Sequence, residues 1–184
     1  MRCLGILIVA IFTLSGCETF SVHQYSLSQQ NTATIKNTIL MTGQLTSLAV
    51  GEFTASNPGQ FELRCGINNL IKMPRNTPYE KYIREALIEE LKKAGVHSLD
   101  QIEAGRVITG NLDTFKLDSD TGDWVIKITI TFKSGESFTV SETYEHNEIS
   151  CEEAASSLVT AVQELIHKII THPVFQSKMG NQEE

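Results

Sequence analysis

Every second residue from Trp124 to Phe132 is a large apolar one, in the stretch WVIKITITF. Lysine and threonine occupy most of the positions between them. A strict period of two with many β-branched residues predicts a half-buried antiparallel strand. Ser134-Gly135 then predicts a turn into a second strand at 136–146, so that the two strands form a hairpin. The apolar face of such a hairpin must be covered by another layer.

Two amphipathic helices are predicted that can supply this layer. The first, TPYEKYIREALIEELKKAG at 77–95, begins with a Thr-x-x-Glu capping box and ends at a glycine. Its apolar residues repeat every three to four positions, which is typical of one buried helix face. The second begins with the box Ser-Cys-Glu-Glu at Ser150 and carries a wide apolar stripe, and Pro173 prevents its continuation.

Three further strands are predicted, at 34–53, 61–65 and 105–119. The element order is then β-β-α-β-β-β-α. It predicts an α+β fold: a two-layer sandwich in which a mostly antiparallel sheet of about five strands is covered by two amphipathic helices. We expect a single domain at 36–176, followed by a frayed polar tail at 177–184.

The N-terminal stretch MRCLGILIVAIFTLSGC has one positive residue, an apolar run from Leu4 to Leu14, and then two small residues. The run is too short to span a membrane, and this three-part layout is typical of a secretory signal, here predicted at 1–16. Residues 17–35 are polar with no sustained period, so we expect a flexible tether there.

The end of this run, Leu14-Ser15-Gly16-Cys17, resembles the lipobox of bacterial lipoproteins. The resemblance implies that Cys17 carries a diacylglycerol on its sulfur, that the signal is cut just before it, and that its amino group receives a fatty acid such as palmitate. Glu18 resembles the residue that follows the cysteine in lipoproteins sent to the outer membrane rather than kept at the inner membrane. The expected location is therefore the periplasmic side of the outer membrane, with several acyl chains as a stable anchor.

Two cysteines then remain in the mature chain, Cys65 and Cys151, because Cys3 leaves with the signal and Cys17 is lipidated. In an oxidising periplasm this even pair favours a disulfide. Two buried free thiols are the alternative. A zinc site that adds His146 would lack the close ligand pairs of structural zinc sites, so we do not favour it.

Charge and motifs argue against nucleic-acid binding and against catalysis. The formal net charge is -7 and no basic stripe occurs, whereas phosphate binding needs clustered lysine and arginine. The nucleophile elbow, the P-loop, the zinc-protease motif and the Cys-x-x-Cys motif do not occur in the sequence. Glu85, Glu89 and Glu90 are expected on the solvated face of the first helix. We therefore expect a non-catalytic protein with no cofactor.

Asp118, Asp120 and Asp123 form the one acidic cluster that could bind calcium through oxygen ligands. In DSDTGD, however, the glycine and the last aspartate are transposed relative to an EF-hand loop, and Thr129 stands where the closing glutamate would be. A β-hairpin turn rich in aspartate and glycine explains the same residues, and we favour that interpretation.

The connection at 66–76, GINNLIKMPRN, places apolar residues among asparagine, proline and basic residues. One interpretation is a loop whose apolar side chains pack under the first helix. The other is a partner-docking loop that the Cys65 disulfide holds at its base. Its candidate contact residues are Leu70, Ile71, Met73 and Arg75.

A longer pattern runs through the mature domain: Cys65 before a loop, a Tyr-x-x-x-Ala-Leu-x-x-Glu-Leu helix at 82–91, a Gly-x-Leu strand at 110–112, Trp124 on a strand, and Cys151 at the start of the last helix. It resembles small envelope lipoproteins with a TolB-N-terminal-like or LpoB-like α+β fold, and the resemblance implies protein–protein contact.

Three functional hypotheses follow. The leading one is a lipid-anchored, non-catalytic envelope protein that binds another envelope protein or complex. The first alternative is an auxiliary lipoprotein of an envelope transport system that binds a lipid or small ligand in a groove between sheet and helices. The second is a hydrolase with an unrecognised site, which predicts a concave cluster of groups with shifted pKa values.

Overall fold

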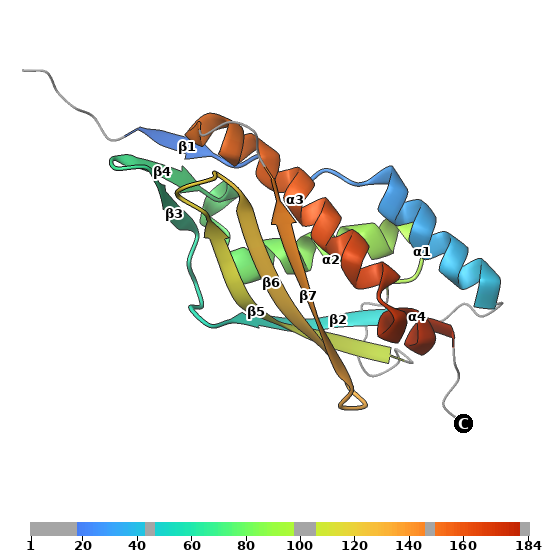
Figure 1. Cartoon of the computed structure of the whole chain (residues 1–184). Coiled ribbons are helices and arrows are strands. Elements are labelled where there is room, and N and C mark those ends of the chain that lie inside the picture. Colours follow the sequence, from blue (N-terminus) through green and yellow to red (C-terminus); the bar gives the residue numbers. More distant parts are fainter. Residues whose placement is uncertain (1–17, 43–46, 98–105, 146–149, 181–184) are drawn as a thin grey trace, which may run out of the picture.

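The computed structural model describes residues 18–42, 47–97, 106–145 and 150–180, which form an α+β fold (Figure 1). The helices are α1 (Gln29–Thr42), α2 (Tyr79–Ala94), α3 (Cys151–Thr171) and α4 (Pro173–Gly180), and a short 3-10 turn, η1 (Pro74–Asn76), precedes α2. The strands are β1 (Thr19–Ser21), β2 (Leu48–Ala55), β3 (Glu62–Cys65), β4 (Asn69–Lys72), β5 (Arg106–Leu117), β6 (Trp124–Phe132) and β7 (Ser137–Tyr144). The predicted fold class is confirmed, but the element count and order differ from the expected five strands and two helices.

The strands form two mixed sheets rather than one mostly antiparallel sheet. The larger has the order β2-β5-β6-β7 and the smaller has the order β1-β4-β3. Each sheet contains one parallel pair, β2–β5 and β1–β4, while the other neighbours are antiparallel. In the larger sheet Ile128 of β6 faces Leu112 of β5 and Val140 of β7, so apolar residues from three strands line one face.

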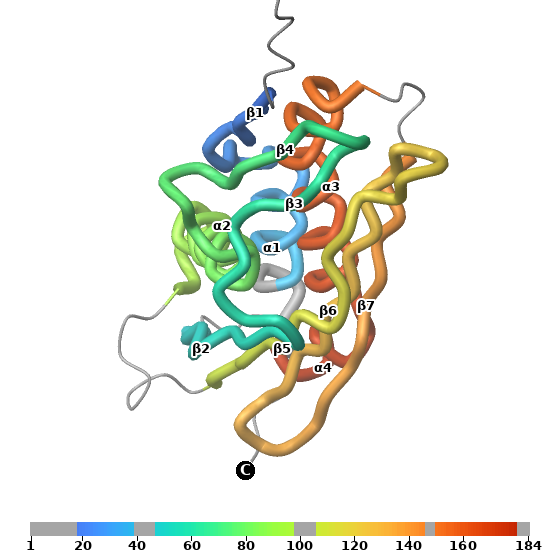
Figure 2. Tube along the Cα trace, turned by 90° about the vertical axis from the view of Figure 1, so that its left-hand side faces the viewer, coloured from blue at the N-terminus to red at the C-terminus, as the bar shows by residue number. Residues whose placement is uncertain are grey.

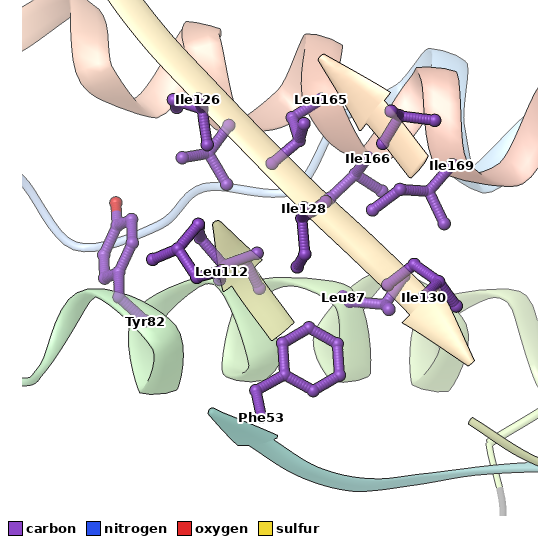
Figure 3. Packing of buried hydrophobic residues seen from close by; sticks show 14 of the residues in the cluster. Phe53, Tyr82, Leu87, Leu112, Ile126, Ile128, Ile130, Leu165, Ile166 and Ile169 are labelled. Atoms are coloured by element: carbon purple, nitrogen blue, oxygen red, sulfur yellow. The ribbon is translucent and has the colours of Figure 1, made fainter. Parts of the chain in front are cut away.

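The two predicted amphipathic helices cover this apolar face. The helix α2 packs on β2 and β5, and α3 packs on β6 and β7 (Figures 1 and 2). The alternating isoleucines of β6 are fully buried, as their period predicts, and they meet side chains of α2 and α3 in one cluster (Figure 3). Trp124 is buried as well, and its indole Nε1 donates a hydrogen bond to the Ala154 carbonyl oxygen at 2.9 Å.

Of the two predicted capping boxes, the one at α3 forms and the one at α2 does not. At α3 the Ser150 hydroxyl accepts a hydrogen bond from the backbone N–H of Glu153 at 3.2 Å, as expected. At α2 no side chain caps the helix, and the Glu80 carboxylate instead accepts from the backbone N–H of Gly59 at 2.9 Å. The glutamate of the α2 box therefore fastens the turn before β3 to the helix, which sequence spacing cannot reveal.

The expectation for the N-terminal segment is wrong. The sequence predicts a flexible tether at residues 17–35, whereas β1 and most of the first two turns of α1 fall inside that range. The strand expected at 34–53 is also wrong in its first half, because α1 extends to Thr42 and β2 begins at Leu48. The polar segment has no local apolar period, and side chains far away in the sequence hold it instead, as described below.

The C-terminal expectation needs a smaller correction. Residues 177–184 were predicted to be frayed, but α4 continues to Gly180 and buries Met179. Pro173 does end α3, as predicted, and then serves as the first residue of α4, a position in which its missing N–H is tolerated.

Gly110 of β5 lies directly opposite Phe53 of β2, and a Cβ atom at this position would come within 2.8 Å of the Phe53 ring. We expect Gly110→Ala to lower the free energy of unfolding by about 1–3 kcal/mol, because the ring has to move out of a packed core. Urea unfolding measures the change. The same substitution in a Phe53→Leu background should have a smaller effect, and strictly additive effects of the two changes would contradict this explanation.

Candidate functional site

The predicted disulfide between Cys65 and Cys151 is present, with the two Cα atoms 5.8 Å apart. Cys65 is the last residue of β3 and Cys151 is the first residue of α3. The bond therefore fastens the small sheet to the start of the helix that covers the larger sheet.

The strand β1 is an edge strand that pairs with β4 on one side. The Glu18 carbonyl accepts a hydrogen bond from the N–H of Leu70 at 3.0 Å, and the N–H of Val22 donates to the Lys72 carbonyl at 2.8 Å. Because backbone groups alternate in direction along a strand, the N–H and C=O groups of Thr19 and Ser21 point away from β4. Among the described residues β4 is the one strand paired with β1, so this edge is open.

A pocket of about 760 Å³ lies between β1 and the first turns of α3. Its lining is mostly polar: Thr19, Phe20, Ser21, His23, Ser150, Glu152, Glu153, Ala155 and Ser156. β1 and α3 are also in contact, and Figure 1 shows β1 beside the start of the helix. We call this the β1–α3 pocket. It combines the open edge of a strand with two carboxylates, hydroxyl groups, one phenyl ring and one imidazole.

Glu90 of α2 accepts hydrogen bonds from residues 25–32, the segment that follows the β1 wall of the pocket. Its side chain is fully buried and accepts hydrogen bonds from the Tyr25 hydroxyl at 2.7 Å, the Ser28 N–H at 2.6 Å and the Thr32 hydroxyl at 2.9 Å. Burial, with the Glu90 contact in addition, raises the pKa of Tyr25 far above its usual range. Tyr25 therefore remains a hydrogen-bond donor at any physiological pH. The sequence expectation that Glu90 lies on a solvated helix face is wrong.

Two further contacts fix the same chain. The Tyr82 hydroxyl of α2 donates to the His23 carbonyl at 3.1 Å, and the Gln163 side chain of α3 donates to the Ser26 carbonyl at 2.8 Å. Burial also raises the pKa of Tyr82, which keeps its proton available for this bond. The pocket wall formed by residues 19–23 is thus attached to α2 at His23, and the segment that follows it is attached to α3 at Ser26.

The candidate docking residues fall into two groups. Ile71 and Met73 are 0% and 2% exposed and belong to the core, so they cannot contact a partner in this structure. Leu70 is half-buried on β4, and Arg75 is exposed within η1, where its φ of 54° is left-handed. The supposed loop contains β4, the central strand of the small sheet, and this is why its apolar residues point inward. The interpretation in which they pack inside the domain holds for Ile71 and Met73.

The acidic cluster forms the turn between β5 and β6. One Asp118 carboxylate oxygen accepts hydrogen bonds from the N–H groups of Asp120 and Thr121 at 3.0 and 3.3 Å. These two donors hold the pKa of Asp118 below its usual value. This is the aspartate turn that we favoured over a calcium loop, and the described part of the chain contains no group of three metal-ligating side chains.

Some predictions concern residues outside the described ranges. The signal at 1–16 and the lipidation of Cys17 lie there. The zinc alternative is wrong whatever the place of His146, because its other two ligands, Cys65 and Cys151, are joined in the disulfide. In the part of the chain that is described, no helix is long and apolar enough to cross a bilayer.

Sequence reasoning did not single out the β1–α3 pocket. The wall formed by α3 can be predicted from the sequence, because the Ser150 capping box marks the start of that helix. The wall formed by β1 cannot, because this strand has only three residues, and no periodicity distinguishes its exposed, half-buried, exposed pattern from a linker.

Comparison with known proteins identifies shared folds and no family. No family model matches the sequence, and no curated protein matches it. A Xanthomonas campestris protein of the DUF330 family model is 10% identical over 72% of this chain and 86% of its own, with a TM-score of 0.57. An uncharacterised protein is 12% identical over 89% of this chain and 97% of its own, with a TM-score of 0.53. These likenesses establish a shared fold.

A third solved structure is the PelC dodecamer from Paraburkholderia phytofirmans. It is 15% identical over 68% of this chain and 83% of its own, and its TM-score is 0.43.

Proposed function

We propose that the protein is a lipid-anchored, non-catalytic envelope protein on the periplasmic side of the outer membrane, and that it binds an extended segment of another envelope protein along β1. The resemblance of Leu14–Cys17 to a lipobox supports the anchor. The open edge of β1 inside the β1–α3 pocket is the observation that carries the binding function. A strand added to such an edge gains backbone hydrogen bonds, while a flanking pocket accepts its side chains.

The lining of the pocket favours a peptide over a lipid. Seven of the nine lining residues are polar, one is alanine, and Phe20 is the one large apolar residue. A bound acyl chain would need a mainly apolar cavity. The chemistry of the pocket suits a partner segment with hydroxyl, amide or basic side chains, which can pair with Glu152 and Glu153.

The hydrolase alternative gains no support from the titratable groups. The tyrosines with strongly raised pKa values, Tyr25, Tyr79 and Tyr82, owe the shift first to burial. They pack in the core cluster or beside it, and none of them lines the pocket. We therefore propose the binding function alone.

Photo-crosslinking in intact cells tests the proposal. A photoreactive phenylalanine analogue at Ser156, an exposed residue of the pocket lining, should give a crosslinked protein product, and the same probe at Ser134 in the β6–β7 turn should not. Ser21→Pro removes an N–H that points into the pocket and spares the pairing with β4. Loss of one hydrogen bond of about 1 kcal/mol should lower the yield about fivefold.

Ser21→Ala is the matched control, because it loses the side-chain hydroxyl and keeps the backbone N–H, and its yield should be clearly higher than that of Ser21→Pro. A product that persists unchanged in Ser21→Pro would rule out strand addition along β1. Equal products from Ser156 and Ser134 would show that the pocket is not the contact site.

A further inference from the structure

The turn between β3 and β4 presents one fully exposed isoleucine. Ile67 is 91% exposed, more than any other large apolar residue among those described. Cys65 pairs with Asn69, so the turn consists of Gly66, Ile67 and Asn68. Glycine and asparagine are usual in such turns, whereas a β-branched residue is not. Ile67 therefore contributes neither a turn preference nor core burial to the fold.

The β3–β4 turn lies beside the start of β1, and this position indicates a role for Ile67. β1 and β4 are parallel, with Thr19 paired to Leu70, so both strands begin at the same end of the small sheet. The Glu18 carbonyl is bonded to the Leu70 N–H at that end. Cys17 is joined to Glu18 by a peptide bond, which places their Cα atoms about 3.8 Å apart. A lipid on Cys17 would thus enter the bilayer beside the β3–β4 turn.

We propose that Ile67 inserts into the periplasm-facing leaflet of the bilayer that holds the anchor, as a second, apolar contact that fixes the orientation of the domain. The inference rests on the lipid anchor of the proposed function. The Cys65–Cys151 bond supports it by tying the base of the turn to α3, so the tip is presented on a rigid support.

The charges at this end of the molecule favour an apolar contact with the bilayer over electrostatic attraction to anionic lipids. Glu18 and Glu152 are exposed there together with Arg64, so the local charge is not positive. Anionic lipids are attracted by clusters of lysine and arginine, which this end lacks among the described residues. The contact is accordingly apolar, and it should persist at high salt.

Tryptophan fluorescence in bilayers tests this contact. The full lipidated chain is reconstituted into vesicles of phosphatidylethanolamine and phosphatidylglycerol that carry bromine-labelled acyl chains. With Ile67→Trp, the added indole should be quenched by the bromolipids, and its emission should shift to the blue. Ser134→Trp is the matched control, since it lies in the β6–β7 turn at the opposite end of the molecule (Figures 1 and 2). It should show neither effect, and buried Trp124 gives the same background in both variants.

The outcomes separate the two proposals. Both variants should unfold like the wild type, because both positions are exposed. A lipidated, vesicle-bound Ile67→Trp protein without quenching overturns the insertion of Ile67 and leaves the anchor intact. Equal quenching of both variants overturns the fixed orientation. A native chain whose intact mass shows an unmodified Cys17 overturns the anchor and, with it, this inference.

Discussion

A Cys65→Ala, Cys151→Ala double variant should be less stable than the wild type by about 4–5 kcal/mol, the largest single effect we expect in this chain. The bond closes a loop with a sequence separation of 86 residues. In the chain-entropy description, a crosslink over such a length lowers the conformational entropy of the unfolded state, and this loss raises the free energy of unfolding by about 4–5 kcal/mol. Urea unfolding of both proteins gives the difference directly.

A reductant supplies the control for this prediction. It should lower the stability of the wild type by a comparable amount and leave the double variant unchanged. Hydrogen exchange should accelerate most in the small sheet, which the bond attaches to α3, and least in β6 at the centre of the larger sheet. A double variant within about 1 kcal/mol of the wild type would contradict the assigned role, given the expected range.

Replacing Glu90 by alanine should lower the free energy of unfolding by about 3 kcal/mol. The carboxylate is fully buried and is the acceptor for Tyr25, Ser28 and Thr32. Each buried donor left without a partner costs about 1–3 kcal/mol, and some of the three will regain a bond to water. Hydrogen exchange should show faster opening of residues 22–35 before the rest of the domain.

Glu89 offers a matched control on the same helix. It is exposed and pairs with Lys92 at the surface, at 2.8 Å, so Glu89→Ala should change the stability by less than about 0.5 kcal/mol. Glu90→Gln keeps one acceptor oxygen and should fall between the two alanine variants. Equal effects of the alanine substitutions at 89 and 90 would show that the buried network does not hold the N-terminal segment.

The elements that the sequence predicts well are those whose own residues determine their environment. The period of two in β6 and the apolar stripe of α3 each specify a buried face without reference to the rest of the chain. The N-terminal segment is different, because it gains its structure from distant partners. Its main fastening point is Glu90, a carboxylate in a run of charged residues that looks solvated in the sequence.

The candidate site is hard to predict for the same reason. The Cys65–Cys151 pairing could be predicted from cysteine counting and compartment alone, which requires no geometry. The pocket requires β1 to lie beside α3, and their first residues are separated by more than a hundred positions in the chain. Ile67 lies in the connection 66–76, which the sequence marks as a candidate docking loop. The sequence does not show that this connection divides into a turn and the strand β4, and this division is what leaves Ile67 exposed and Ile71 buried.

The parallel pairing of β1 with β4 has a mechanical consequence for an anchored protein. A pull on the N-terminal residue, directed away from the domain, runs along the axis of β1. The hydrogen bonds to β4 at Glu18 and Val22 are then loaded together in shear, instead of being opened one after another. From β4 the force passes through the β3–β4 turn and the disulfide to α3, the longest helix of the fold. A protein built this way can bear tension between a membrane and a bound partner without unravelling from its anchored end.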